Sequence, residues 1–172
     1  MSEAVPEFSR LVPLSQLGGT PFLQRIEATA EEREKLSRRF GLLALDRLLA
    51  EVELRRQSAE VVRLEATFEA EFEQCCIVTL DPVRGTVSDH FSLIYGPAPT
   101  DQREFILSGD EPAFEPLDRD EIDIGEAVAQ ELSLALPVFP RDPEAVIDGV
   151  DPAEPFEGPF AALARLRTEP ER

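Results

Sequence analysis

The sequence predicts an α+β fold: a mainly antiparallel β-sheet, built as a meander of long strands, with two helices and a proline-rich C-terminal tail. Three observations predict it. Apolar and polar residues alternate without a break over residues 62–73, which is typical of a strand with one buried and one solvated face. Residues 30–40 and 124–136 carry helix-capping signals and a helical pattern of apolar residues. Six prolines over residues 137–159 exclude continuous secondary structure there.

The first helix is predicted from its ends. Thr29 precedes it, and Glu32 stands three residues later, which is the pattern of a capping box. Gly41 is expected to end the helix, because glycine adopts the left-handed conformation at a helix C-terminus without strain. The sequence therefore predicts a helix over residues 30–40.

The strands are predicted from alternation of apolar and polar residues. Residues 8–13 and 22–28 are expected to be short edge or cap strands, and residues 46–56, 62–73 and 86–95 long ones. The connections between the three long strands are too short for a parallel crossover, so we expect an antiparallel meander. In the strand over residues 62–73, a slip of one position would bury the glutamates, which fixes its register.

The chain after the meander is less regular. One more short strand is expected at residues 104–107, and an acidic, proline-bearing loop at residues 109–120. We expect a single α+β domain over residues 8–137. Residues 138–172 are expected to be a proline-rich acidic tail, wrapped on the surface or partly disordered.

The second helix is predicted over residues 124–136. Asp123 is its expected N-cap, and Glu126 completes a capping box in the loose sense. Glu131 is the one polar residue on the apolar stripe of this helix. Leu132 lies on the same stripe, and we expect it to be buried against the sheet.

Composition limits the function classes. The formal charge is −18, and residues 101–172 hold 19 acids and 6 bases. Such a balance argues against a broad nucleic-acid footprint, which needs a basic face. It favours partners with a basic surface. The chain shows no apolar run long enough for a membrane span and no signal sequence at its N-terminus, so we expect a cytoplasmic protein without membrane contact.

Enzyme motifs are scarce. Cys75 and Cys76 are expected to be free thiols, and His90 is the one histidine of the chain. A thiol-based enzyme or redox-sensing module using Cys76 with Cys75 or His90 is the alternative reading, although a histidine on a solvated strand face is usually a surface residue. Two cysteines and one histidine fall short of a zinc site. We expect no catalytic, cofactor-binding or metal-binding residues.

Two motifs carry a family resemblance. Residues 76–82 read Cys-Ile-Val-Thr-Leu-Asp-Pro, and residues 123–137 combine an aspartate cap, a helix, a second glutamate and a proline stop. Together they resemble the YceD family of large ribosomal RNA subunit accumulation proteins, over roughly residues 8–150. The positions that mark the family here are Cys76, Leu80, Pro82, Asp123, Glu131 and Pro137.

The resemblance implies a non-catalytic role in the synthesis, processing or stability of large-subunit ribosomal RNA. Many members have a CxxC at the first motif and further cysteines after the proline stop. This chain has Thr79 at the second cysteine position and no cysteine after Pro137, so metal binding is not carried over.

The net negative charge of the chain then suggests which kind of partner it acts through. We expect a ribosomal protein or ribosome assembly factor with a basic surface as the partner, and indirect contact with the ribosomal RNA. The candidate interaction surface is Glu65, Glu69, Glu71, Glu73, Asp123, Glu126 and Glu131. The sequence does not determine the oligomeric state.

Overall fold

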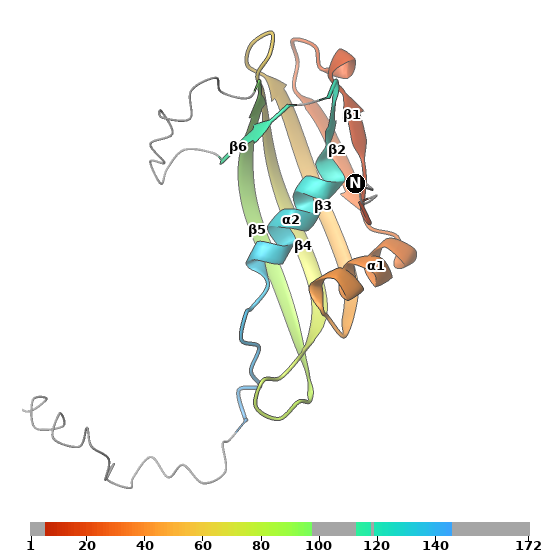
Figure 1. Cartoon of the computed structure of the whole chain (residues 1–172), viewed down its shortest axis with the longest axis vertical. Coiled ribbons are helices and arrows are strands. Elements are labelled where there is room, and N and C mark those ends of the chain that lie inside the picture. Colours follow the sequence, from red (N-terminus) through yellow and green to blue (C-terminus); the bar gives the residue numbers. More distant parts are fainter. Residues whose placement is uncertain (1–5, 98–112, 118, 146–172) are drawn as a thin grey trace, which may run out of the picture. The chain divides into compact units, whose positions relative to one another are not determined.

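The computed structural model describes residues 6–97, 113–117 and 119–145. Five strands form one sheet in the order β2-β3-β4-β5-β6, and β1 and β7 form a second, two-stranded sheet (Figure 1). In chain order the elements are β1 (Leu11–Pro13), the 3-10 turn η1 (Leu14–Gln16), β2 (Phe22–Glu27), α1 (Ala30–Phe40), β3 (Ala44–Arg56), β4 (Val62–Cys75), β5 (Pro82–Gly96), β6 (Ala113–Pro116), β7 (Glu121–Asp123) and α2 (Ile124–Ala135).

The central strand β4 has the predicted register. Its even-numbered apolar side chains all point into the core and are at most 2% exposed. They are Val62, Leu64, Ala66, Phe68, Ala70 and Phe72. The Phe68 ring meets the Phe91 ring of β5 with centroids 6.2 Å apart. The alternation along β4 therefore determines which face of the sheet is buried.

The antiparallel meander of β3, β4 and β5 is confirmed. The register of β3 against β4 shifts between Leu45 and Arg47, so Asp46 is accommodated by a bulge. β5 begins at Pro82, four residues before the predicted start, because it remains paired with β4 up to Cys75. Turn-forming residues lie near the hairpin, and because of them the sequence pattern did not predict this extension of the strand.

Helix α1 has the predicted bounds and both predicted caps. The Glu32 amide donates to the Thr29 hydroxyl at 3.3 Å, and the Thr29 amide donates to the Glu32 carboxylate at 2.8 Å. Gly41 follows with φ of 66°, in the left-handed region. The capping box and the glycine stop are thus confirmed.

The segment predicted as a loop at residues 109–120 contains a strand. Ala113–Pro116 forms β6 and pairs in parallel with residues 93–96 of β5, so the loop prediction is wrong for these four residues. Its proline is tolerated because β6 is an edge strand. Glu121–Asp123 also pairs with β1, which the sequence did not suggest. The strand expected at residues 104–107 lies outside the described residues.

Helix α2 crosses the sheet over β4 and β5 (Figure 1). It begins at Ile124 after the predicted cap and ends at Ala135, just before Pro137. Ile124, Val128 and Leu132 are completely buried in the same core as the β4 side chains. Among the described residues, no helix combines the length and apolar character needed to cross a membrane.

Candidate functional site

The four β4 glutamates chosen from the sequence lie on the solvated face of the sheet, and each has an arginine within ion-pair distance. The pairs are Glu65 with Arg63 at 2.8 Å, Glu69 and Glu71 with Arg47 at 3.7 and 3.5 Å, and Glu73 with Arg84 at 2.7 Å. Exposed pairs of this kind add little to stability. They do compensate the glutamate charges locally.

The whole solvated face of β2 to β5 shows the same compensation. The strand registers place seven glutamates on it, at positions 27, 51, 53, 65, 69, 71 and 73. They also place five arginines there, at positions 25, 47, 55, 63 and 84. Asp46, which is exposed at the bulge in β3 and interacts electrostatically with Arg84, is an eighth acid. This face therefore has a formal charge of only −3, a small part of the −18 of the chain.

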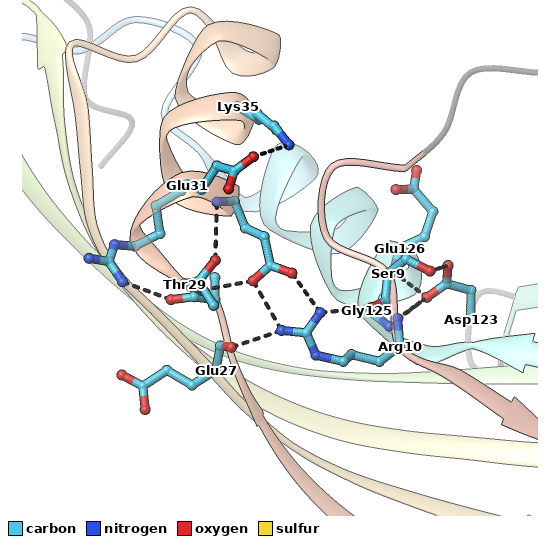
Figure 2. A network of polar contacts seen from close by, with 12 residues as sticks. Ser9, Arg10, Glu27, Thr29, Glu31, Lys35, Asp123, Gly125 and Glu126 are labelled. Atoms are coloured by element: carbon cyan, nitrogen blue, oxygen red, sulfur yellow. Dashed lines mark hydrogen bonds and ion pairs between the residues drawn. The ribbon is translucent and has the colours of Figure 1, made fainter.

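Asp123 has a structural role, which Figure 2 shows. Its Oδ1 accepts hydrogen bonds from the amides of Gly125 and Glu126 at 3.1 and 3.2 Å, which caps α2 as predicted. The same oxygen accepts from the Arg10 amide at 2.7 Å, and Oδ2 accepts from the Ser9 hydroxyl at 2.6 Å. The carboxylate thus joins the first turn of α2 to the chain before β1.

Arg10 extends this network to α1 (Figure 2). Its guanidinium donates to both carboxylate oxygens of Glu32, at 2.6 and 3.0 Å, and to the carbonyl oxygens of Ser9 and Glu27. The hydrogen bond from Arg10 lowers the pKa of Glu32 to about 2. Because both side chains are largely shielded from solvent, this ion pair links the N-terminal segment to the helix cap.

We expect Glu32 to make stability depend on pH. Its folded-state pKa is lowered, so its contribution is present above the unfolded pKa of about 4.5 and is lost as the pH falls towards 2. The expected contribution is about 1 to 2 kcal/mol after allowing for solvent screening. Urea unfolding at several pH values measures it.

Two variants of helix α1 test this pH dependence against the wild-type chain. Glu32→Gln should lose less stability between about pH 5 and pH 2.5 than the wild-type chain, whereas the exposed Glu34→Gln should follow the wild type. Parallel pH profiles for Glu32→Gln and the wild type would contradict the assignment.

Glu126 does not act as the capping-box residue that the sequence suggested. Its carboxylate accepts from the Arg39 guanidinium at 2.8 and 3.0 Å and from the Gln130 amide at 3.2 Å. Arg39 also pairs with Glu7 at 2.9 Å. These hydrogen bonds raise the pKa of Arg39, with Glu126 contributing most. Glu126 therefore connects α2 to α1, a tertiary contact that local sequence cannot reveal.

Glu131 differs from the other candidate residues. It is half-buried, and in the described part of the chain its carboxylate has no hydrogen-bond or ion-pair partner. Burial raises its pKa, and the neighbouring Asp89 and Glu115 raise it further. Of the seven candidate residues, Glu131 alone has a carboxylate without a hydrogen-bond or ion-pair partner among the residues that the structure describes.

The structure gives Cys76 a role that sequence reasoning missed. The side chain is fully buried, and its Sγ accepts hydrogen bonds from the amides of Val78 and Thr79, both at 3.4 Å, and of Asp142 at 3.5 Å. These bonds lower the pKa of the Cys76 thiol to about 7, led by the Asp142 amide and followed by the Thr79 side chain. Thr79 stands where many family members have a cysteine, and this difference was the sequence feature that could have indicated hydrogen bonding to Cys76.

The segment after α2 is attached to this turn by two further hydrogen bonds. The Ile77 amide donates to the Pro140 carbonyl at 2.9 Å, and the Gln74 side chain donates to the Pro137 carbonyl at 3.1 Å. Figure 1 shows this blue segment running beside the loop that joins β4 to β5. Residues 138–142, the start of the tail that we expected to be wrapped on the surface or partly disordered, lie beside the turn.

The other two residues of the thiol hypothesis are not assembled into a site with Cys76. Cys75 donates to the Leu80 carbonyl at 3.2 Å. His90 pairs with Thr67, eight residues along β4 from Cys75. At about 3.3 Å per residue this separation is roughly 26 Å. The structure therefore does not bring His90 to the cysteines.

The turn does not fit a tetrahedral zinc site. Residue 79 offers a hydroxyl and an amide as hydrogen-bond donors, whereas structural zinc takes thiolate or imidazole ligands. Over residues 6–97, 113–117 and 119–145, no three histidine, cysteine, aspartate or glutamate side chains gather in a way that could hold a metal ion.

Comparison with known proteins gives one match. A family model described as "Large ribosomal RNA subunit accumulation protein YceD" matches residues 64–167. No curated protein and no solved structure matches the chain. The matched range includes β4, the cysteine turn, β5 and α2, which are the elements that build the site described above.

Proposed function

Because this chain belongs to the YceD family, we propose that it supports the accumulation of large-subunit ribosomal RNA as a non-catalytic factor that binds a basic protein. The family model supplies the link to the ribosomal RNA. The partner class is inferred from the charges of this chain. A ribosomal protein or a ribosome assembly factor has the required chemistry.

The observation that supports this proposal is that most basic side chains already have partners within the fold. Over residues 6–97 there are eleven of them, and eight form ion pairs within the chain. Arg33 and Arg56 donate to main-chain carbonyls. Arg25 lies opposite Glu51 in the sheet register. For ten of these eleven side chains, phosphate would therefore have to compete with contacts that the fold already makes.

The acidic side chains are not balanced in the same way. Residues 101–172 carry a formal charge of −13, and the six bases there cannot compensate 19 acids. A chain with this excess repels RNA at a distance and attracts a basic protein. The two charge observations together support direct contact with a protein and indirect contact with RNA.

Two measurements test the proposal. Deleting the gene should lower the ratio of large-subunit to small-subunit ribosomal RNA, which tests the family-level role. The purified full chain should bind RNA-free proteins extracted from large subunits at about 0.15 M salt, and should not bind protein-free large-subunit RNA tightly. Tight binding to the naked RNA would overturn the protein-mediated route.

A thiol-based module remains a second candidate because one observation favours it. The lowered pKa of Cys76 gives it more thiolate at neutral pH than an ordinary cysteine. Its complete burial opposes reaction with external molecules. We expect slow alkylation of Cys76 in the folded protein in spite of its low pKa.

We expect the Cys76 thiol to titrate at about pH 7. Thiolate absorbance of a Cys75→Ser variant measures this value without interference from Cys75. Replacing Thr79 by valine should raise the midpoint, since it removes the hydroxyl donor. Stability should increase from about pH 7 to 9, where the folded thiol has lost its proton and the unfolded one has not. A midpoint at or above about 8.5 would contradict the hydrogen-bonded thiolate.

A further inference from the structure

Large apolar side chains are exposed on the turn that follows β4 and on the segment that follows α2. Leu80 is 74% exposed, Val138 80%, Phe139 76% and Ile77 53%. These four, which we call the apolar tip, are half of the eight large apolar side chains that are exposed over residues 6–97, 113–117 and 119–145. A concentration of this kind marks a surface that another molecule covers.

Hydrogen bonds hold the two segments of the apolar tip together. The bond from the Ile77 amide to the Pro140 carbonyl places the two segments side by side next to Phe139. The Cys76 Sγ joins them a second time by accepting from amides of both segments. The tip is therefore preorganised, which reduces the entropy lost when a partner binds.

Leu80 adds an independent sign of function. Its φ is 65°, in the left-handed region, where a leucine is strained. The Leu80 amide donates to the Cys76 carbonyl at 3.0 Å, so the turn geometry holds it there. Glycine would adopt this conformation without strain. A leucine that is strained and also exposed contributes little to folding, which points to a use outside the fold.

The charges around the tip indicate what covers it. Over residues 76–81 and 136–142, the acids are Asp81 and Asp142 and the one base is Arg141. The last turn of α2, which carries the negative end of the helix dipole, contains no basic residue. The chain as a whole has a formal charge of −18. An apolar surface in acidic surroundings complements a basic protein better than RNA or a second copy of this chain.

We propose that the apolar tip is the docking surface for the basic partner protein, whose apolar side chains cover Leu80, Val138 and Phe139 while its lysines and arginines face the surrounding carboxylates. This inference rests on the proposed function and deepens it by naming the contact surface. The apolar contacts supply affinity, and the carboxylates supply orientation and selectivity.

The experiment uses the full chain with a photoreactive benzoylphenylalanine in place of Phe139, or of Leu23 as the control. Leu23 is 72% exposed on β2, away from the tip. The probe is the mixture of RNA-free proteins from large ribosomal subunits, and mass spectrometry identifies the crosslinked product. We expect one basic protein to crosslink at position 139 and not at position 23.

The variant Leu80→Gly separates docking from folding. It removes the apolar side chain and relieves the strain, so we expect stability to rise while crosslinking at position 139 and affinity for the identified protein fall at least tenfold. Unchanged affinity in Leu80→Gly would overturn the docking surface alone. Crosslinks to a second copy of this chain, or equal crosslinking at both positions, would also overturn it. Absence of binding to any large-subunit protein would overturn the proposed function as well.

Discussion

The Leu132→Ala variant is expected to unfold with about 2 to 5 kcal/mol less free energy than the wild-type chain. Leu132 is fully buried where α2 covers the sheet. The substitution removes the transfer free energy of the side chain and leaves a cavity that the surrounding strands cannot fill completely. Urea unfolding followed by circular dichroism measures the loss, with the slope of the transition checking that both chains unfold in two states.

The matched control lies two residues further along α2. Leu134 is 77% exposed, so Leu134→Ala removes the same atoms from the same helix with little loss of burial. We expect a change within about 0.5 kcal/mol. Similar losses in the two variants would mean that α2 does not present Leu132 to the core.

Replacing Gly125 by alanine should cost about 3 kcal/mol, although alanine is the better helix former. A Cβ at this position would lie 2.5 Å from the Phe8 carbonyl oxygen and 3.0 Å from the Arg10 amide nitrogen. Both obstacles are main-chain atoms, so no side chain can move aside. The first turn of α2 would have to separate from the N-terminal segment that Asp123 binds.

Gly19→Ala is the control for this substitution. A Cβ at Gly19 meets nothing within 4 Å, and we expect a change of no more than about 0.5 kcal/mol. Thermal unfolding of the two variants beside the wild type measures the difference. If Gly125→Ala were as stable as the wild type, the close approach of α2 to the N-terminal segment would be disproved.

The parts of the fold that the sequence predicts best are those determined by neighbours in the chain. The capping box of Thr29 and Glu32, the stop at Gly41 and the register of β4 each depend on residues a few positions apart. The strand β6 was missed because Ala113–Pro116 has no strand pattern of its own. It becomes a strand only by pairing with β5, whose matching residues lie about twenty positions earlier.

The candidate site residues also divide into those whose role depends on local sequence and those whose role depends on tertiary contacts. Sequence reasoning identified Asp123 as the N-cap, since a cap is a local feature. It could not foresee that Arg47 and Arg84 compensate the β4 glutamates, because those pairs are formed across strands. Glu126 was misassigned for the same reason, since its partner Arg39 is 87 residues away.

Composition, motifs and local periodicity were enough to predict the α+β class, the buried face of β4, the family and the excess of acid over base. Contacts between distant segments were needed to show which acids are compensated and where exposed apolar side chains come together. Cys76 illustrates the reason: its Sγ accepts from Asp142, 66 residues away, and that bond exists only after β4, β5 and α2 have been brought together.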